Sequence, residues 1–168
     1  MRASVSSAKK KRKRNKISYP MILIIVSVIL SLDQLSKFIV TSNVSYFQPV
    51  PVIKNFFYIS LVHNRGAAFG ILKNQTPLFI FTSILAIILI ILNLKSGKNG
   101  KSYSIFLSLI LAGALGNLID RVFFGYVIDF LDFRIWPVFN VADSAITIGA
   151  VLLAWNILFD KKNVSLHL

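Results

Sequence analysis

Four long runs of apolar residues divide the chain, and polar or mixed segments separate them. The runs cover about residues 17–40, 77–94, 103–121 and 140–159. A helix needs about 20 predominantly apolar residues to cross the hydrocarbon core of a bilayer, so each run is close to the length of one span. The pattern therefore predicts an all-α membrane protein, a bundle of four transmembrane helices.

The segment between the first two runs, residues 41–75, follows a different pattern. Pro49 and Pro51 would interrupt a helix. The stretch FFYISLVHN, Phe56 to Asn64, is rich in aromatic and β-branched residues, which are typical of a strand. A loop of small residues, NRGAAFG at 64–70, follows it. We therefore expect a small β-like segment between the first and second helices.

Composition agrees with a membrane protein of one embedded domain. The 168 residues are 55% hydrophobic and 15% charged, with a mean hydropathy of +0.71, which excludes an ordinary soluble domain. Cysteine is absent, which excludes a disulfide framework and a thiolate metal site. The first run is too long for a cleavable signal peptide and ends in SLDQLSK rather than a small-residue cleavage site. It is interpreted as a retained helix at the start of a four-span domain, residues 17–160.

Basic residues set the expected orientation of the spans. The formal charge is +13, and eight of the nineteen Lys and Arg residues precede position 17. We interpret residues 1–16 as a disordered tail that contacts anionic phospholipid, not nucleic acid. This tail, the loop at 95–101 and a C-terminal tail at 161–168 hold thirteen of the nineteen basic residues. The positive-inside rule then places both termini in the cytoplasm and makes segments 41–75 and 122–139 extracytoplasmic.

The charged residues of three helices should converge at one depth. Asp33 and Asp143 lie 16 residues, and Asp120 17 residues, from the cytoplasmic ends of their runs. At about 1.5 Å per helical residue, these separations are about 24–26 Å, which is the outer leaflet. Ionisable residues inside a membrane are costly and mark functional sites. We therefore expect the active layer near the outer surface.

Helical spacing places several polar residues on shared faces. Asp33 and Lys37 are four residues apart, which predicts an ion pair, either structural or part of a site. Asn117, Asp120 and Arg121 also share one face. Asp120 is interpreted as the charge partner of Arg121, in support of the site.

Two carboxylates remain as candidates for chemistry. Asn140 is suited to the N-cap of the fourth helix, so that Asp143 takes the third helical position, where the helix dipole favours its ionised form. Asp129 is assigned to an apolar loop, VIDFLDF, where desolvation should raise its pKa. If the two carboxyls meet, they share one proton and can act as base and acid in hydrolysis. Asp132 is interpreted as a solvated loop charge near Arg134.

Residues alone leave three functions open. One is a hydrolase with an Asp129–Asp143 pair, and another is a small proton- or ion-coupled transporter in which the Asp residues form a relay. The third is a membrane scaffold held by ion pairs. A transporter is expected to place charges near the bilayer midplane and to contain internal repeats, neither of which the sequence indicates. His63 and His167 fall on opposite sides of the membrane and the chain contains no Glu, so we expect hydrolysis without a metal or other cofactor.

Four sequence blocks together resemble the lipoprotein signal peptidase family, also called signal peptidase II. They are DQLSK (33–37), NRGAAFG (64–70), GNLIDRVFFGYVIDF (116–130) and FNVADSAITIG (139–149). The resemblance covers about residues 17–159. It implies an aspartic endopeptidase of the bacterial cytoplasmic membrane. Its substrates would be diacylglyceryl-modified prolipoproteins, from which it removes the signal peptide by cleaving before the lipidated cysteine. Independently of the resemblance, we expect the protein to act as a monomer and without a cofactor.

The resemblance also implies roles for individual residues. Asp129 and Asp143 would be the catalytic pair. Asn64 and Arg121 would hold the substrate backbone, Asn117 and Asn140 would orient the pair, and Asp33 with Lys37 would brace the site. Beyond the resemblance, we expect Asp120 to support the site beside Arg121, and Gly66 to leave room for the substrate backbone. Two departures from the family pattern are a Ser at position 36, where Thr is frequent, and a separation of only 14 positions from Asp129 to Asp143.

Overall fold

The structure, a computed structural model, describes residues 18–66, 74–96 and 100–159. Within these ranges it has four helices and three strands: α1 (Tyr19–Asn43), β1 (Val50–Ile53), β2 (Phe57–Asn64), α2 (Thr76–Ser96), α3 (Lys101–Phe124), β3 (Val127–Asp132) and α4 (Val141–Phe159). All four helices are long and apolar enough to cross a membrane. The prediction of four spans is confirmed, whereas the predicted tails at 1–16 and 161–168 lie outside the described residues.

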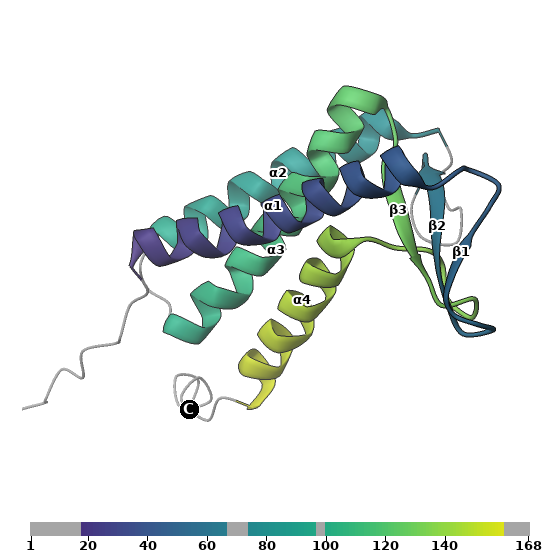
Figure 1. Cartoon of the computed structure of the whole chain (residues 1–168). Helices are drawn as coiled ribbons and strands as arrows, with labels where there is room; N and C mark the ends of the chain where they lie inside the picture. The colour runs from purple at the N-terminus through teal and green to yellow at the C-terminus, as the bar shows by residue number, and fades with distance from the viewer. Residues whose placement is uncertain (1–17, 67–73, 97–99, 160–168) are drawn as a thin grey trace, which may run out of the picture.

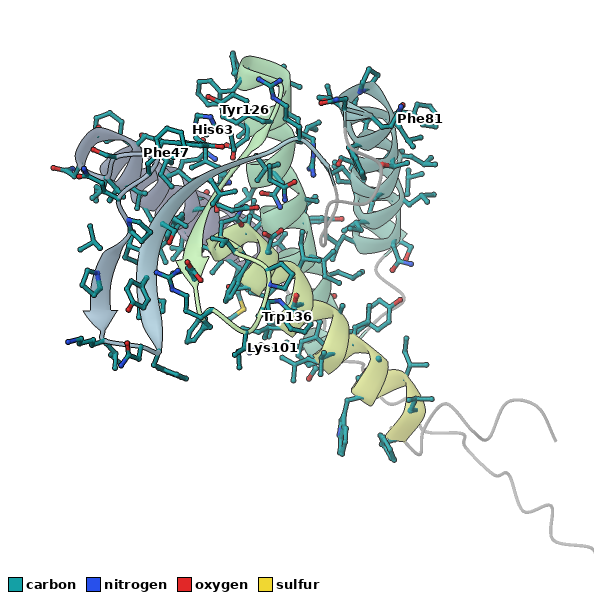
Figure 2. The ribbon with its side chains drawn as sticks, turned by 90° about the vertical axis from the view of Figure 1, so that its right-hand side faces the viewer. Phe47, His63, Phe81, Lys101, Tyr126 and Trp136 are labelled. Atoms are coloured by element: carbon teal, nitrogen blue, oxygen red, sulfur yellow. The ribbon has the colours of Figure 1, made fainter. Side chains whose placement is uncertain are left out.

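Helix α3 is the central element of the bundle, and α1, α2 and α4 all pack against it. In an apolar stretch of 18 residues within α3, 44% of the residues are buried inside the protein, against 11–17% in the corresponding stretches of the other three helices. The outer faces of those helices carry large exposed apolar side chains such as Leu23, Phe81 and Trp155. Figure 2 shows Phe81 on α2 pointing away from the bundle. Such faces are suited to contact with lipid, because hydrocarbon solvates apolar side chains.

Small residues allow α3 and α4 to pack closely. A Cβ atom on Gly113 would clash with the carbonyl oxygen of Ala142. On α4, a Cβ atom on Gly149 would lie 2.8 Å from the backbone oxygen of Phe106. Close approach through small residues is how helices associate in membranes, where van der Waals packing replaces the hydrophobic effect. The contact fixes the position of the first turn of α4 against α3.

A three-stranded antiparallel sheet, in the order β1-β2-β3, lies at the end of the bundle where α1 and α3 end and where α2 and α4 begin (Figure 1). β2 confirms the strand predicted at 56–64. β3 was predicted to be a loop, and this prediction is wrong: Asp129 pairs with Val62 in the register of β2 and β3. Strand β3 is almost wholly buried, so it lacks the alternation of apolar and polar residues by which a half-buried strand is recognised. A core of Val40, Leu61, Ile128 and Phe130 joins the sheet to the end of α1.

Asp132, at the end of β3, is not the solvated loop charge that was predicted. It is buried, and Ser60 of β2 donates a hydrogen bond of 2.7 Å from Oγ to Asp132 Oδ2. Its predicted proximity to Arg134 is confirmed, since Arg134 Nε lies 3.7 Å from the same oxygen. Pairing with β2 brings Ser60 to this carboxylate and explains its burial.

The turn between α3 and β3 also fixes the start of α2. Gly125 ends α3 in the left-handed conformation, with φ of 79°, which glycine adopts without steric cost. Thr76, at the start of α2, donates a hydrogen bond of 2.9 Å from Oγ1 to the carbonyl oxygen of Gly125. The sheet end of α2 is thereby tied to the segment that leads into β3.

Candidate active site

Asp129 and Asp143 line one cavity of about 1020 Å³. Asp129 projects from β3 and is 1% exposed, whereas Asp143 lies in the first turn of α4 and is half-buried. An isolated bridge between Leu131 and Phe139 turns the chain back after β3. This reversal brings the start of α4 next to the strand, so that a short connection suffices to place both carboxylates in the same cavity.

Asn140 joins the elements that carry the two carboxylates. Its Nδ2 donates to Asp129 Oδ1 at 2.7 Å, and its Oδ1 accepts the backbone N–H of Asp143 at 2.8 Å. The second bond confirms the predicted N-cap of α4. Because Asn140 is fully buried, an unsatisfied amide there would be costly, and the side chain is held in one orientation.

Asn117 of α3 is the second amide in the site. Its Nδ2 donates to Asp143 Oδ1 at 2.8 Å. Its Oδ1 accepts from Lys37 Nζ at 3.3 Å and from Asn140 Nδ2 at 3.1 Å. Two donors on Oδ1 fix the orientation of the amide, because an amide oxygen can only accept and an amide nitrogen can only donate. The donor of Asn117 must therefore face Asp143.

A buried cluster of charges lies behind these amides. Lys37 Nζ is 2.7 Å from Asp33 Oδ2 and 2.8 Å from Asp120 Oδ2. The first distance confirms the predicted ion pair, whereas the predicted pairing of Asp120 with Arg121 is wrong. Adjacent helical residues project in different directions, and Asp120 faces α1. Gln34, which sequence reasoning missed, donates to Asp33 at 3.1 Å and to Asp120 at 3.2 Å.

Asp33 and Asp120 of this cluster also accept hydrogen bonds from the backbone of α4 and β3, the elements that carry Asp143 and Asp129. Asp33 Oδ1 accepts the N–H of Ala142 at 2.9 Å, in the first turn of α4. Asp120 Oδ2 accepts the N–H of Ile128 at 3.0 Å, in β3. The residues that directly precede Asp129 and Asp143 are therefore both hydrogen-bonded to carboxylates of this cluster.

Asn64, Gly66 and Arg121 line the same cavity. Asn64 Nδ2 donates to Asp129 Oδ2 at 2.9 Å, and its Oδ1 accepts the N–H of Gly66 at 2.9 Å. The guanidinium carbon of Arg121 lies 5.0 Å from the ring centroid of Phe79, within the range of a cation–π contact. The rest of the small-residue loop, residues 67–70, lies outside the described residues.

The surroundings of Asp129 favour its protonated form. Burial raises the pKa of its carboxyl to about 7, and the nearby negative charge of Asp143 acts in the same direction. Hydrogen bonds from Asn64 and Asn140 oppose this rise by stabilising the carboxylate. A carboxyl with this pKa can donate or accept a proton near neutral pH, as a general acid or base must.

The cavity continues from the carboxylates into the bundle. Its walls there come from α2, α3 and α4 and include Ala86, Ala114 and Ile146. Helix α2 carries no ionisable residue before Lys95. In the described part of the chain, no three His, Asp or Glu side chains group so that they could hold a metal ion. The arrangement offers two carboxylates, one guanidinium and several amides beside an apolar channel.

Comparison with known proteins identifies the family. The family model described as Signal peptidase (SPase) II matches residues 25–159. The chain belongs to the signal peptidase II family. It is 46% identical over 137 residues to the lipoprotein signal peptidase of Moorella thermoacetica, covering 81% of this chain and 91% of that protein. It is 45% identical over 133 residues to the lipoprotein signal peptidase of Halothermothrix orenii, covering 79% and 92%.

Solved structures agree with membership of the signal peptidase II family. A bacterial membrane enzyme determined by the in meso method at 2.3 Å resolution superposes with a TM-score of 0.81 at 32% identity, over 92% of this chain and 96% of the other. A second such structure, at 1.9 Å resolution, gives a TM-score of 0.78 at 33% identity, over 88% and 99%. As a member of this family, the protein is a multi-pass protease of the bacterial membrane that removes signal peptides from prolipoproteins.

Proposed function

We propose that the protein is an aspartic endopeptidase that uses Asp129 and Asp143 as its catalytic pair. The observation that carries this proposal is that both carboxylates line one cavity. Asn140 hydrogen-bonds to Asp129 and to the backbone of Asp143, and Asn117 holds the Asp143 side chain. Preorganised groups of this kind keep reacting atoms in place during catalysis.

The two carboxyls have different surroundings, which suggests different roles. Asp143 lies at the N-terminus of α4, where the helix dipole favours a negative charge. Asp129 is buried on β3, and burial and the neighbouring carboxylate raise its pKa to about 7. We therefore assign the shared proton of the resting enzyme to Asp129 and the base to Asp143.

Hydrolysis then proceeds in two steps. Asp143 takes a proton from water, whose oxygen attacks the scissile carbonyl carbon while the Asp129 carboxyl donates a hydrogen bond to the carbonyl oxygen. The carbon–nitrogen bond breaks as a proton passes to the leaving amine, giving a carboxylate on the signal peptide and a free amino group on the mature lipoprotein. No step uses a metal, so activity should persist in a chelator.

The remaining groups of the cavity suit a peptide backbone. The Arg121 guanidinium can donate to substrate carbonyl oxygens, and Gly66 leaves room beside Asn64 for an extended backbone. Asp33, Lys37 and Asp120 brace the site from behind. One chain supplies all of these groups, and we expect the monomer to be active.

The substrate is proposed to be a diacylglyceryl-modified prolipoprotein that enters from the bilayer, with cleavage immediately before the lipidated cysteine. The apolar channel between α2, α3 and α4 suits an apolar signal peptide. Purified protein should cleave a lipid-modified prolipoprotein and leave the unmodified form intact, and mass spectrometry should place the lipidated cysteine at the new N-terminus. Cleavage at another bond, or equal cleavage of both forms, would contradict this assignment.

The active site is proposed to face outward, with both termini in the cytoplasm. The distribution of Lys and Arg supports this orientation. Because the chain contains no Cys, single cysteines can report it. In intact spheroplasts, a membrane-impermeant maleimide should label Lys54→Cys, between β1 and β2, and should leave Lys95→Cys, at the end of α2, unlabelled. The reverse pattern would invert the topology.

A further inference from the structure

We propose that the loop 133–138, between β3 and α4, binds one acyl chain of the substrate's diacylglyceryl group, with Ile135 and Trp136 as its contact residues. This inference rests on the proposed function, because it requires the residue after the scissile bond to carry the lipid. It adds a lipid-binding role to a loop for which the sequence indicated only a short connection.

The loop is fixed at its start by polar contacts. Asp132 Oδ1 accepts the backbone N–H of Arg134 at 2.9 Å, and Ser60 holds the other carboxylate oxygen at 2.7 Å. The guanidinium carbon of Arg134 lies 3.8 Å from the ring centroid of Tyr58. Arg134 has a φ of 64°, in the left-handed region that only a few per cent of non-glycine residues adopt. Unusual backbone of this kind persists where surrounding contacts impose it, and it is concentrated at functional sites.

Aromatic rings hold the base of the same loop. The ring of Phe133 lies 4.7 Å from that of Phe57 and 5.9 Å from that of Phe139, measured between centroids. The N–H of Ile135 bonds to the carbonyl oxygen of Phe133 at 2.8 Å, which closes a tight turn. These contacts therefore fix the backbone from which Ile135 and Trp136 project.

This construction presents two large apolar side chains outward. Ile135 is 89% exposed and Trp136 is 61% exposed, yet both line the cavity that contains Asp129 and Asp143. Figure 2 labels Trp136 on the loop that returns from β3 to the first turn of α4. Exposed apolar side chains that border a site commonly mark a binding surface. Ile148, which is on α4 and exposed, lines the same cavity and extends the apolar surface along that helix.

The position of the loop relative to the scissile bond indicates which part of the substrate contacts it, namely an acyl chain. Residues before the scissile bond belong to the apolar signal peptide, which fits the channel inside the bundle. The lipidated cysteine lies immediately after that bond, so its acyl chains leave the catalytic pair on the other side. The loop joins the strand of Asp129 to the helix of Asp143, and it offers an apolar path from both carboxylates to the outer face of α4. An acyl chain that leaves this point for the bilayer would cover Ile135, Trp136 and Ile148.

The test compares two synthetic prolipoproteins that differ only in their acyl chains, one dipalmitoyl and one dibutanoyl, both in the same lipid nanodiscs. For Trp136→Ser, we expect KM for the dipalmitoyl substrate to rise about five- to tenfold relative to wild type, because a large apolar contact is lost, while kcat stays unchanged. For the dibutanoyl substrate, the ratio of mutant to wild-type KM should be close to one. Using this ratio cancels the effect of chain length on partitioning into the membrane.

Three further variants sharpen the result. Trp136→Phe should restore most of the affinity, and Ile135→Ser should act in the same direction as Trp136→Ser. Trp155→Ser removes a similarly exposed tryptophan at 64% exposure, far along α4, and should leave both KM values unchanged.

Equal KM ratios for the two substrates would show that the loop contacts peptide or bilayer and would overturn the inference, as would no change in KM. Failure of the wild-type enzyme to cleave before the lipidated cysteine would instead overturn the proposed function, and this inference with it.

Discussion

Asn140 donates a hydrogen bond of 2.7 Å from Nδ2 to Asp129 Oδ1. The same side chain caps α4 through the N–H of Asp143. One buried amide thus sets the position of the strand carboxylate relative to the helix that carries the other carboxylate. This amide acts together with the bridge between Leu131 and Phe139, which reverses the chain between the two carboxylates.

Replacing Asn140 with Ser should separate the capping role from the role toward Asp129. Serine is also a favoured N-cap, but its hydroxyl is too short to serve both partners. We expect activity to fall about a hundredfold, the order of loss when a positioned donor is removed. The hydrogen bond from Asn140 lowers the pKa of Asp129, so the alkaline limb of the pH–rate profile should move to higher pH.

Asn43→Ser, at the exposed end of α1, is the matched control for this substitution. It should change neither the rate nor the pH profile. A profile for Asn140→Ser that coincides with that of the wild type would mean that Asn140 acts only as a helix cap.

The raised pKa of Asp129 predicts how activity depends on pH. If its neutral carboxyl polarises the scissile carbonyl and its proton reaches the leaving amine, kcat/KM should fall as the pH rises through about 7, where this carboxyl ionises. The measurement is kcat/KM for a lipid-modified substrate across this range. A rate that stays constant well above this pH would contradict the assignment of the acid.

The same pKa has a consequence for stability. The folded pKa lies above the ordinary value of 3.8, so the folded state binds the proton more tightly than the unfolded state does. The contribution of Asp129 to stability is therefore fully present below pH 3.8, the ordinary pKa, and is lost as the pH rises to about 7. Asp129→Asn removes this loss. The difference in Tm between the variant and wild type, measured in detergent, should therefore shift in favour of the variant from pH 5 to pH 8. This shift corresponds to a change on the order of a few kcal/mol in the free energy of unfolding. A constant Tm difference would contradict it.

Lys37 should be essential for stability because it neutralises two buried carboxylates. Lys37→Met leaves Asp33 and Asp120 buried without a cation, and breaking a buried ion pair in this way costs about 3–5 kcal/mol. We expect a large fall in Tm by thermal unfolding in detergent. Adding Asp33→Asn and Asp120→Asn to Lys37→Met should recover part of the loss.

Lys54→Met, an exposed lysine between β1 and β2, controls for the loss of a lysine and should leave Tm unchanged. A Tm of Lys37→Met equal to that of the wild type would refute the bracing role of the cluster.

The helices and β2 could be predicted because each carries its signal within its own residues. A span must be apolar over about 20 residues to replace water by hydrocarbon, and β2 is a run of aromatic and β-branched residues. Within one helix, the spacing of Asp33 and Lys37 was enough to predict their ion pair. The N-cap of α4 was also predictable, since Asn140 and Asp143 are three residues apart.

The missed features depend on elements that meet only in the folded protein. Asp120 pairs with Lys37 because of how α1 and α3 are rotated toward each other, which no spacing within α3 encodes. Gln34 joins the same cluster for the same reason. Asp132 is buried because β2 brings Ser60 to it. Strand β3 lacked a recognisable period because it is covered on both faces.

The catalytic roles of Asp129 and Asp143 are tested by the rate at which Asp129→Asn and Asp143→Asn cleave a diacylglyceryl-modified prolipoprotein, beside wild type and with chelator present. Asn preserves shape but cannot exchange a proton, so each substitution should lower the rate by about 10²–10⁴-fold. Asp160→Asn, one residue beyond α4, controls for the loss of a carboxylate and should cleave as wild type does. We expect wild type to keep its activity in chelator while both site variants lose theirs. Full cleavage by either site variant, or loss of wild-type activity in chelator, would contradict it.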